Sequence, residues 1–98
     1  MQFSIRTINY QKQSMLNICD AELLGKKIIE GDLTMHISEN YYGERFVEQD
    51  EAKSLLNNSS IINMAGKKTI SLALELGIGT EKAVKIVSDV PFLIIFNM

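Results

Sequence analysis

The sequence predicts a small α+β domain in which a mixed or antiparallel sheet of β-hairpins packs against two short helices. Several short segments alternate apolar and polar residues, which is the period of half-buried strands. Two longer segments have helical spacing and are bounded by capping residues and glycines. The 98 residues, of which 46% are hydrophobic and 22% charged, fit a single domain over residues 1–98 with one core.

The N-terminal region predicts a hairpin followed by a helical turn. Strands over residues 3–8 and 15–19 flank a polar turn at residues 11–13. Asp20 stands where a helix N-cap belongs, and Gly25 where the left-handed residue after a helix belongs. We therefore expect one turn of helix between Asp20 and Gly25.

The middle of the chain predicts a second hairpin, a loop and a short helix. Residues 27–29 and 33–37 form the two strands, with Glu30, Gly31 and Asp32 as the turn. The segment Asn40, Tyr41, Tyr42 and Gly43 is rich in turn formers and predicts a loop. Asp50 then caps a helix that runs through Leu56 and ends in residues 57–60.

The C-terminal region predicts a strand, a helix and a final strand. Residues 61–65 form the first strand, and the helix runs from about Lys67 to Leu76. Thr80 is a candidate cap for one further turn over residues 81–83. The last segment, residues 92–97, is almost continuously apolar, which predicts a strand covered on both faces or one that meets a protein neighbour.

Charge is distributed unevenly along the chain. The net charge is −2, yet residues 30–51 hold seven acids and one base, a net charge of −6. The remaining residues carry a net charge of +4, so a polyanion is a plausible partner for the basic part. Cys19 is the only cysteine, which excludes an intramolecular disulfide and indicates a cytoplasmic protein. The longest apolar run, residues 90–96, is far short of the roughly 20 residues that span a bilayer, so we expect no membrane partner.

Candidate anion sites occur where glycine precedes two lysines. Gly66, Lys67 and Lys68 stand at the predicted start of a helix after a strand, where backbone amides and a lysine attract phosphate. The same three residue types recur at Gly25, Lys26 and Lys27. The spacing is not that of a nucleotide-hydrolysing loop, so RNA or a free anion is the candidate ligand, and a simple turn at Gly66 is the alternative.

Catalytic and metal-binding patterns are weak. His36 is the only histidine and lies on the polar side of its strand, so we expect no metal site and no cofactor. No nucleophile-elbow motif is present, and we expect no enzyme activity. Tyr41 and Tyr42 lie between acids and are expected to pack against the domain rather than to stack on RNA bases.

One alternative pocket remains open. Cys19, Asp20, Glu22 and Asn63, together with Gly66, carry groups able to bind a small molecule or to act as nucleophile, acid and base. Burial of the thiol and helix capping by the acids explain the same residues without chemistry.

Three motifs resemble those of an archaeal family known as domain of unknown function 424. They are residues 19–26 (Cys, Asp, Ala, Glu, Leu, Leu, Gly, Lys), residues 41–43 (Tyr, Tyr, Gly) and residues 63–66 (Asn, Met, Ala, Gly). The resemblance covers nearly the whole chain. Members of that family end in a Val, Pro, His segment, whereas here Phe92 follows Val90 and Pro91.

The resemblance implies a cytoplasmic archaeal protein, and the genes of that family tend to lie near genes for translation initiation and ribosome assembly. We therefore expect a non-catalytic, ribosome-associated accessory protein of the translation apparatus. It would bind a ribosomal subunit or ribosomal RNA through Lys26, Lys27, Lys67 and Lys68. A small-molecule binder or enzyme built on the alternative pocket is the rival hypothesis, and a homo-oligomer joined at the C-terminal strand is the third.

Overall fold

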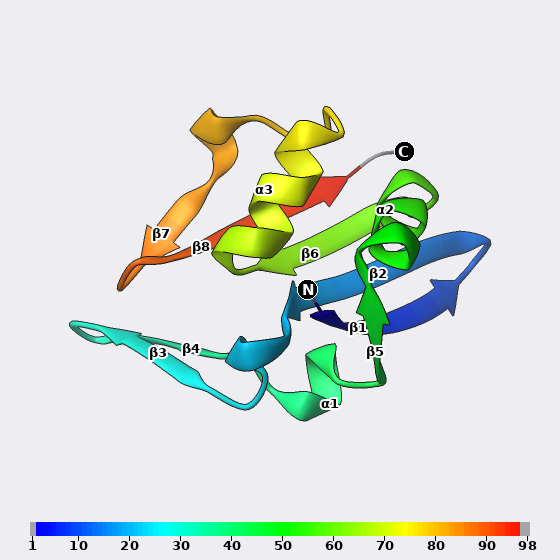
Figure 1. Ribbon diagram of the computed structural model, residues 1–98. Coiled ribbons are helices and arrows are strands. Elements are labelled where there is room, and N and C mark those ends of the chain that lie inside the picture. The colour runs from blue at the N-terminus through cyan, green and yellow to red at the C-terminus, as the bar shows by residue number, and fades with distance from the viewer. Residues whose placement is uncertain (1, 97–98) are drawn as a thin grey trace.

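The computed structural model describes residues 2–96, which form strands and short helices as drawn in Figure 1. In chain order the elements are β1 (Gln2–Tyr10), β2 (Gln13–Asp20), the 3₁₀ turn η1 (Ala21–Leu23), β3 (Lys27–Glu30), β4 (Leu33–His36), α1 (Glu39–Tyr42), β5 (Arg45–Glu48), α2 (Gln49–Asn57), β6 (Ile61–Ala65), α3 (Lys67–Glu75), the 3₁₀ turn η2 (Glu81–Ala83), β7 (Lys85–Val87) and β8 (Val90–Phe96).

Six strands form one mixed sheet in the order β5, β1, β2, β6, β8, β7. Neighbouring strands are antiparallel except β2 and β6, which are parallel. Helices α2 and α3 pack on one face of this sheet (Figure 1). Strands β3 and β4 form a separate two-stranded sheet. The predicted α+β architecture, with a mixed sheet and two short helices against it, is confirmed.

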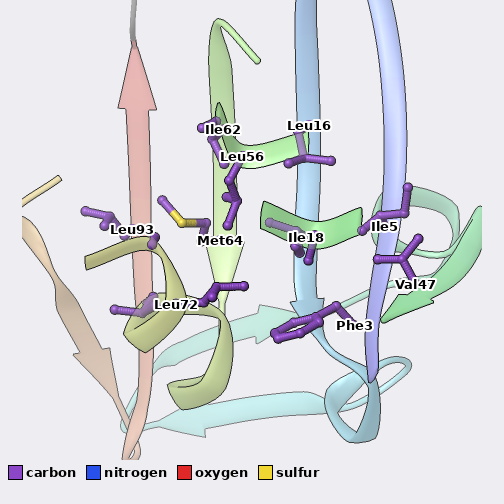
Figure 2. Close-up of a cluster of buried hydrophobic side chains, with 13 residues drawn as sticks. Phe3, Ile5, Leu16, Ile18, Val47, Leu56, Ile62, Met64, Leu72 and Leu93 are labelled. Atoms are coloured by element: carbon purple, nitrogen blue, oxygen red, sulfur yellow. The ribbon is translucent and has the colours of Figure 1, made fainter. Parts of the chain in front are cut away.

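The main core lies between the sheet and these two helices. Alternate residues of β1, β2 and β6 point toward the helices, as the two-residue period of a strand requires. Burial of each large apolar side chain contributes about 1.5–3 kcal/mol to folding. Figure 2 shows the side chains that fill this layer, namely Phe3, Ile5, Leu16, Ile18, Val47, Leu56, Ile62, Met64, Leu72 and Leu93.

A smaller cluster lies on the opposite face, at the end where β2 leads into η1. Cys19 and Ala65 project from the sheet, and Ile37 and Tyr42 cover them from the β4–α1 region. Leu23, Leu24, Ile28 and Phe92 pack around this cluster. The molecule therefore has a second covering layer at one end of the sheet only.

Both predicted hairpins are present. β1 pairs with β2 through a turn in which Gln11 and Lys12 have φ angles of 50° and 68°, the pattern of a type I′ turn. β3 pairs with β4 around Gly31, whose φ is 59°. The tip of the second hairpin reaches the β7–β8 turn, where the backbone N–H of Ser88 donates to Glu30 Oε1 at 2.8 Å.

Residues 40–42 of the predicted loop belong to the helical turn α1 instead, and Gly43 is the residue that ends it. Ser38 is its N-cap, and the Ser38 hydroxyl accepts the backbone N–H of Tyr41 at 3.2 Å. This local cap stabilises α1 despite the turn-forming residues that follow it. The next segment, β5, was not predicted, and it pairs with β1 along the edge of the sheet.

Three predicted caps differ in the structure. Asp20 and Thr80 precede the single turns η1 and η2, but neither side chain accepts a cap hydrogen bond from the turn that follows it. Helix α2 begins at Gln49, one residue before the predicted cap Asp50, so the Asp50 carboxylate lies in the first turn. A carboxylate there still interacts favourably with the helix dipole.

Strand β8 completes the sheet but is not covered on both faces by this chain. It lies between β6 and β7 and spans residues 90–96, whereas residue 97 of the predicted segment lies outside the described residues. Leu93 is buried under α3, whereas Ile94 and Phe96 on the other face are 57% and 67% exposed. The apolar run thus has one buried face and one open face.

Candidate functional site

The last residue of β2 is joined to the first turn of α3. Asp20 Oδ1 accepts the backbone N–H and the hydroxyl of Thr69, each at 2.8 Å, and Oδ2 accepts the backbone N–H of Lys68 at 3.1 Å. The Asp20 side chain is almost completely buried. Asp20 is therefore a helix cap, as its residue type predicted, but for a helix that begins 47 residues later in the chain.

Gly66 allows this contact. Its φ of 110° lies in the region that favours glycine, and a Cβ at this position would lie 2.4 Å from Asp20 Cγ. The parallel pairing of β2 with β6 brings the ends of both strands to the same edge, with Cys19 opposite Ala65. Consequently the first and third motifs of the sequence meet at Asp20 and Gly66.

The anion site predicted at Gly66, Lys67 and Lys68 already contains an anion from the chain itself. The Asp20 carboxylate occupies the amides of Lys68 and Thr69, which a bound phosphate would otherwise use. Any external anion at this end of the molecule therefore has to be held by lysine side chains. Lys67 is exposed there and starts the helix.

Glu22 links two of the predicted cationic residues. Its carboxylate forms an ion pair with Lys68 Nζ at 2.9 Å, and both side chains are about half exposed. The hydrogen bond from Lys68 lowers the pKa of Glu22, and the charge of nearby Lys26 lowers it further. The same pair raises the pKa of Lys68. Loop residue Lys26 and the start of α3 thus lie on either side of one carboxylate.

A hollow of about 370 Å³ opens beside this ion pair. Lys67 and Lys68 line it, but so do three acids, Asp20, Glu22 and Asp89. The charges of the lining therefore nearly cancel. Within residues 2–96, no acid lies within ion-pair distance of Lys26, Lys27 or Lys67.

The residues of the alternative pocket are divided between the two faces of the sheet. Asp20 reaches α3 on the helix-covered face, whereas Cys19 and Asn63 project from the opposite face. Burial raises the pKa of the Cys19 thiol to about 12, and the charges of Asp20 and Glu22 add to this effect. A thiol with that pKa is protonated at neutral pH, the reverse of an activated nucleophile.

Asn63 belongs instead to a polar network with Asn17 and Tyr41. Asn63 Nδ2 donates to Asn17 Oδ1 at 2.8 Å and to the Tyr41 hydroxyl at 3.0 Å, and Asn17 Nδ2 donates to the Tyr41 carbonyl at 3.0 Å. The ring of Tyr41 contacts that of Tyr42 edge to face, with centroids 5.0 Å apart. The network fixes α1 on the sheet. Asn17 was not among the predicted site residues, although an amide within an otherwise apolar strand is a signal for such a partner.

Other site chemistry receives no support from the described residues. Across residues 2–96, no group of three or more His, Cys, Asp or Glu side chains is arranged to hold a metal ion. His36 is exposed on β4. None of the helices in this range has the length and apolar character needed to cross a bilayer.

Comparison with known proteins identifies the family. The family described as protein of unknown function DUF424 has a model that matches residues 8–98. The chain belongs to this family. The resemblance in the three motifs is therefore confirmed, and in this DUF424 member the motifs converge through the contacts of Asp20 with Gly66 and of Tyr41 with Asn63. No match is found among curated proteins.

The DUF424 fold is also present in a solved structure. The crystal structure of an uncharacterized conserved protein from Methanopyrus kandleri aligns with a TM-score of 0.84 and 22% sequence identity. The alignment covers 100% of this chain and 93% of the other. At this level of identity the similarity establishes the fold.

Proposed function

We propose that this DUF424 protein is a non-catalytic, cytoplasmic accessory protein of the archaeal translation apparatus that binds a ribosomal subunit or ribosomal RNA. The observation that carries this proposal is the group of lysines formed by Lys26, Lys27 and Lys67. Lys26 and Lys68 lie on either side of Glu22, Lys27 and Lys67 are their neighbours in the chain, and no acid among residues 2–96 pairs with Lys26, Lys27 or Lys67. Unpaired, exposed lysines are the side chains that exchange counterions for phosphates.

The geometry determines which groups make the contact. The amides of Lys68 and Thr69 in the first turn of α3 are satisfied by Asp20, and Lys68 Nζ is paired with Glu22. Phosphates are therefore bound through the ammonium groups of Lys26, Lys27 and Lys67 alone. With three contacts, the logarithm of the binding constant falls against the logarithm of salt concentration with a slope of about −2 to −3.

Sucrose-gradient sedimentation of the tagged protein in a lysate of the source cells tests this function. We expect co-migration with a ribosomal fraction at low salt and its loss at high salt. A Lys27→Glu/Lys67→Glu variant is expected to leave that fraction, because two of the three contacts are reversed in charge. A Lys53→Glu/Lys82→Glu variant changes the net charge equally on α2 and η2 and is expected to remain bound.

Absence of the wild-type protein from every ribosomal fraction at low salt would refute the translation function. Equal behaviour of the two charge variants would refute the lysine group as the contact. The rival hypothesis of a small-molecule pocket has support for part of its residues only. Asp20, Glu22 and Gly66 line one hollow, whereas Cys19 and Asn63 face the other side of the sheet.

A further inference from the structure

The face of the sheet opposite α2 and α3 is only half covered. Met15, Asn17 and Cys19 point to this face in alternation along β2. At the Cys19 end, η1, the β3–β4 hairpin and α1 form a covering layer (Figure 1). The network of Tyr41 with Asn17 marks the border of that layer. Beyond it, toward Met15, the sheet exposes apolar side chains.

These side chains form a continuous row across four strands, which we name the open row. The register places Ile8 beside Met15, Met15 beside Ile61, and Ile61 beside Phe96. Directly opposed residues project from the same face of a sheet, so the four side chains are neighbours. Phe96 is 67% exposed, and the other three are half-buried. The row therefore offers apolar surface that this chain does not cover.

The apolar surface continues from the open row into a groove. Ile94, next to Phe96 on the same face of β8, is 57% exposed and lines a hollow of about 380 Å³ between the hairpin and β7–β8. The lining contains one charged residue, Lys85; the full set is Leu33, Met35, Ala83, Lys85, Val87, Phe92, Leu93 and Ile94. A concave apolar surface accepts inserted side chains from a partner.

Three cations lie at or beside this surface. Arg6 projects from the same face as the open row, one pair of residues away, because it is paired with Asn17. Lys12 lies in the turn beyond the row, and Lys85 lies in the groove. Hydrogen bonds from the backbone and hydroxyl of Thr7 lower the pKa of Glu44, and the charge of nearby Arg6 lowers it further. Glu30, where the hairpin meets the β7–β8 turn, accepts the backbone N–H of Ser88. Cations thus lie beside the apolar surface at Arg6, Lys12 and Lys85, whereas the two acids near it are hydrogen-bonded within the chain.

We propose that the open row and its groove are a docking surface for an amphipathic helix of another protein, with acidic residues flanking its apolar stripe. Three strand spacings give a row of about 14 Å, which corresponds to about ten helical residues. Acids on either side of the stripe complement Arg6, Lys12 and Lys85. This surface is distinct from the lysine group around Glu22, so the inference stands apart from the proposed RNA contact.

Other occupants fit the surface less well. RNA bases stack on aromatic rings, but three of the four members of the open row are aliphatic. A second copy of this chain would bring its own Arg6, Lys12 and Lys85 to the interface, where they would repel those of the first copy. A bilayer requires protruding apolar side chains, whereas this surface includes a hollow beside Ile94.

Methyl-detected NMR titration of the full-length protein tests the proposal. The probe is a synthetic amphipathic helix with a leucine stripe and glutamate flanks, compared with the same helix carrying lysine flanks. We expect the glutamate helix to shift the methyl signals of Ile8, Met15, Ile61 and Ile94 and to bind more tightly than the lysine helix. Arg6→Glu is expected to weaken binding about two- to fivefold. Phe96→Ser is expected to weaken it about tenfold or more.

Two controls separate this surface from the rest of the molecule. Ile86→Ser removes a side chain that is 64% exposed on β7 but points to the other face, and it is expected to leave binding unchanged. The Lys27→Glu/Lys67→Glu variant, which removes the proposed RNA contact, is also expected to bind the helix normally. Loss of the RNA contact can therefore be distinguished from loss of helix binding at the open row.

Any one of five outcomes would overturn the proposal. Two of them are equal binding of the two helices and no binding of either helix. The others are shifts of the methyl signals of the open row that are caused by a uridine oligonucleotide, by vesicles containing phosphatidylserine, or by a higher concentration of the protein alone.

Discussion

The carboxyl group of Asp20 lies where a side chain on Gly66 would have to be. A Cβ on Gly66 would approach Asp20 Cγ to 2.4 Å, and the same carboxylate holds the first turn of α3. The glycine and the acid are therefore one structural unit, although they belong to motifs far apart in the chain.

Gly66→Ala is expected to lower the free energy of unfolding by about 3–5 kcal/mol, because it combines an unfavourable φ with displacement of the carboxylate. Asp20→Ala alone is expected to cost about 2–3 kcal/mol through loss of the helix cap. The double variant should cost at least about 1 kcal/mol less than the sum, because removal of the carboxylate relieves the clash. Urea unfolding measures the free energy of unfolding of all three variants. Strictly additive losses would show that Asp20 and Gly66 do not act as one structural unit.

Asn63→Ala is expected to destabilise the protein by about 1–3 kcal/mol, because the buried Asn17 Oδ1 loses its donor and Tyr41 keeps only one of its two hydrogen bonds to the sheet. Asn57→Ala, at an exposed position in the last turn of α2, is the matched control and should change stability by less than about 0.5 kcal/mol. Thermal or urea unfolding distinguishes the two variants. Similar losses would mean that the network does not anchor α1.

The pKa of Glu22 is expected to lie below its ordinary value of 4.5, chiefly because Lys68 donates a hydrogen bond to the carboxylate. A lowered pKa in the folded protein adds stability above pH 4.5, and that stability is lost as the pH falls through the folded value. The exposure of both partners makes the contribution small. NMR titration of the carboxyl carbon gives the midpoint directly. Lys68→Met should move it back toward 4.5, and an unchanged midpoint would refute the ion pair.

The Cys19 thiol is expected to resist modification in the folded protein. With a pKa of about 12 instead of 9.0, its thiolate fraction at pH 8 is lower by about a thousandfold. Because the pKa of the thiol is raised in the folded protein, the thiol contributes its full stabilisation below pH 9.0. This stabilisation is lost as the pH rises from 9.0 toward 12. A colorimetric disulfide reagent should react promptly in urea and very slowly without it, and rapid reaction of the native protein would contradict the burial of Cys19.

The sequence predicted the local elements well because their signals are local. The turn at Glu30, Gly31 and Asp32 and the helix after Gly66 are each specified by adjacent residues. The site was harder to predict because its contacts join distant segments. Asp20 is of a residue type that caps helices. The helix that it caps is determined by the parallel pairing of β2 with β6, which no local sequence pattern encodes.

The open row could not be predicted from the sequence for a related reason. The apolar run at the C-terminus predicted a strand with apolar residues on both sides, but not which side the chain itself covers. Ile8, Met15 and Ile61 occur in three separate segments, and only the sheet register brings them beside Phe96. Residues 45–48 were missed as a strand because Arg45 and Glu48 break the apolar pattern around Phe46 and Val47.

The parallel pairing of β2 with β6 has a consequence for the order of folding. Hairpins such as β1–β2 close between neighbouring segments and form within about 1–10 microseconds. Asn17 and Asn63, by contrast, are partners separated by 46 positions, so the two halves of the sheet join only after a long loop has closed. We expect this closure to limit the folding rate, with the N-terminal hairpin and the β6–α3–β8 unit formed first as separate nuclei.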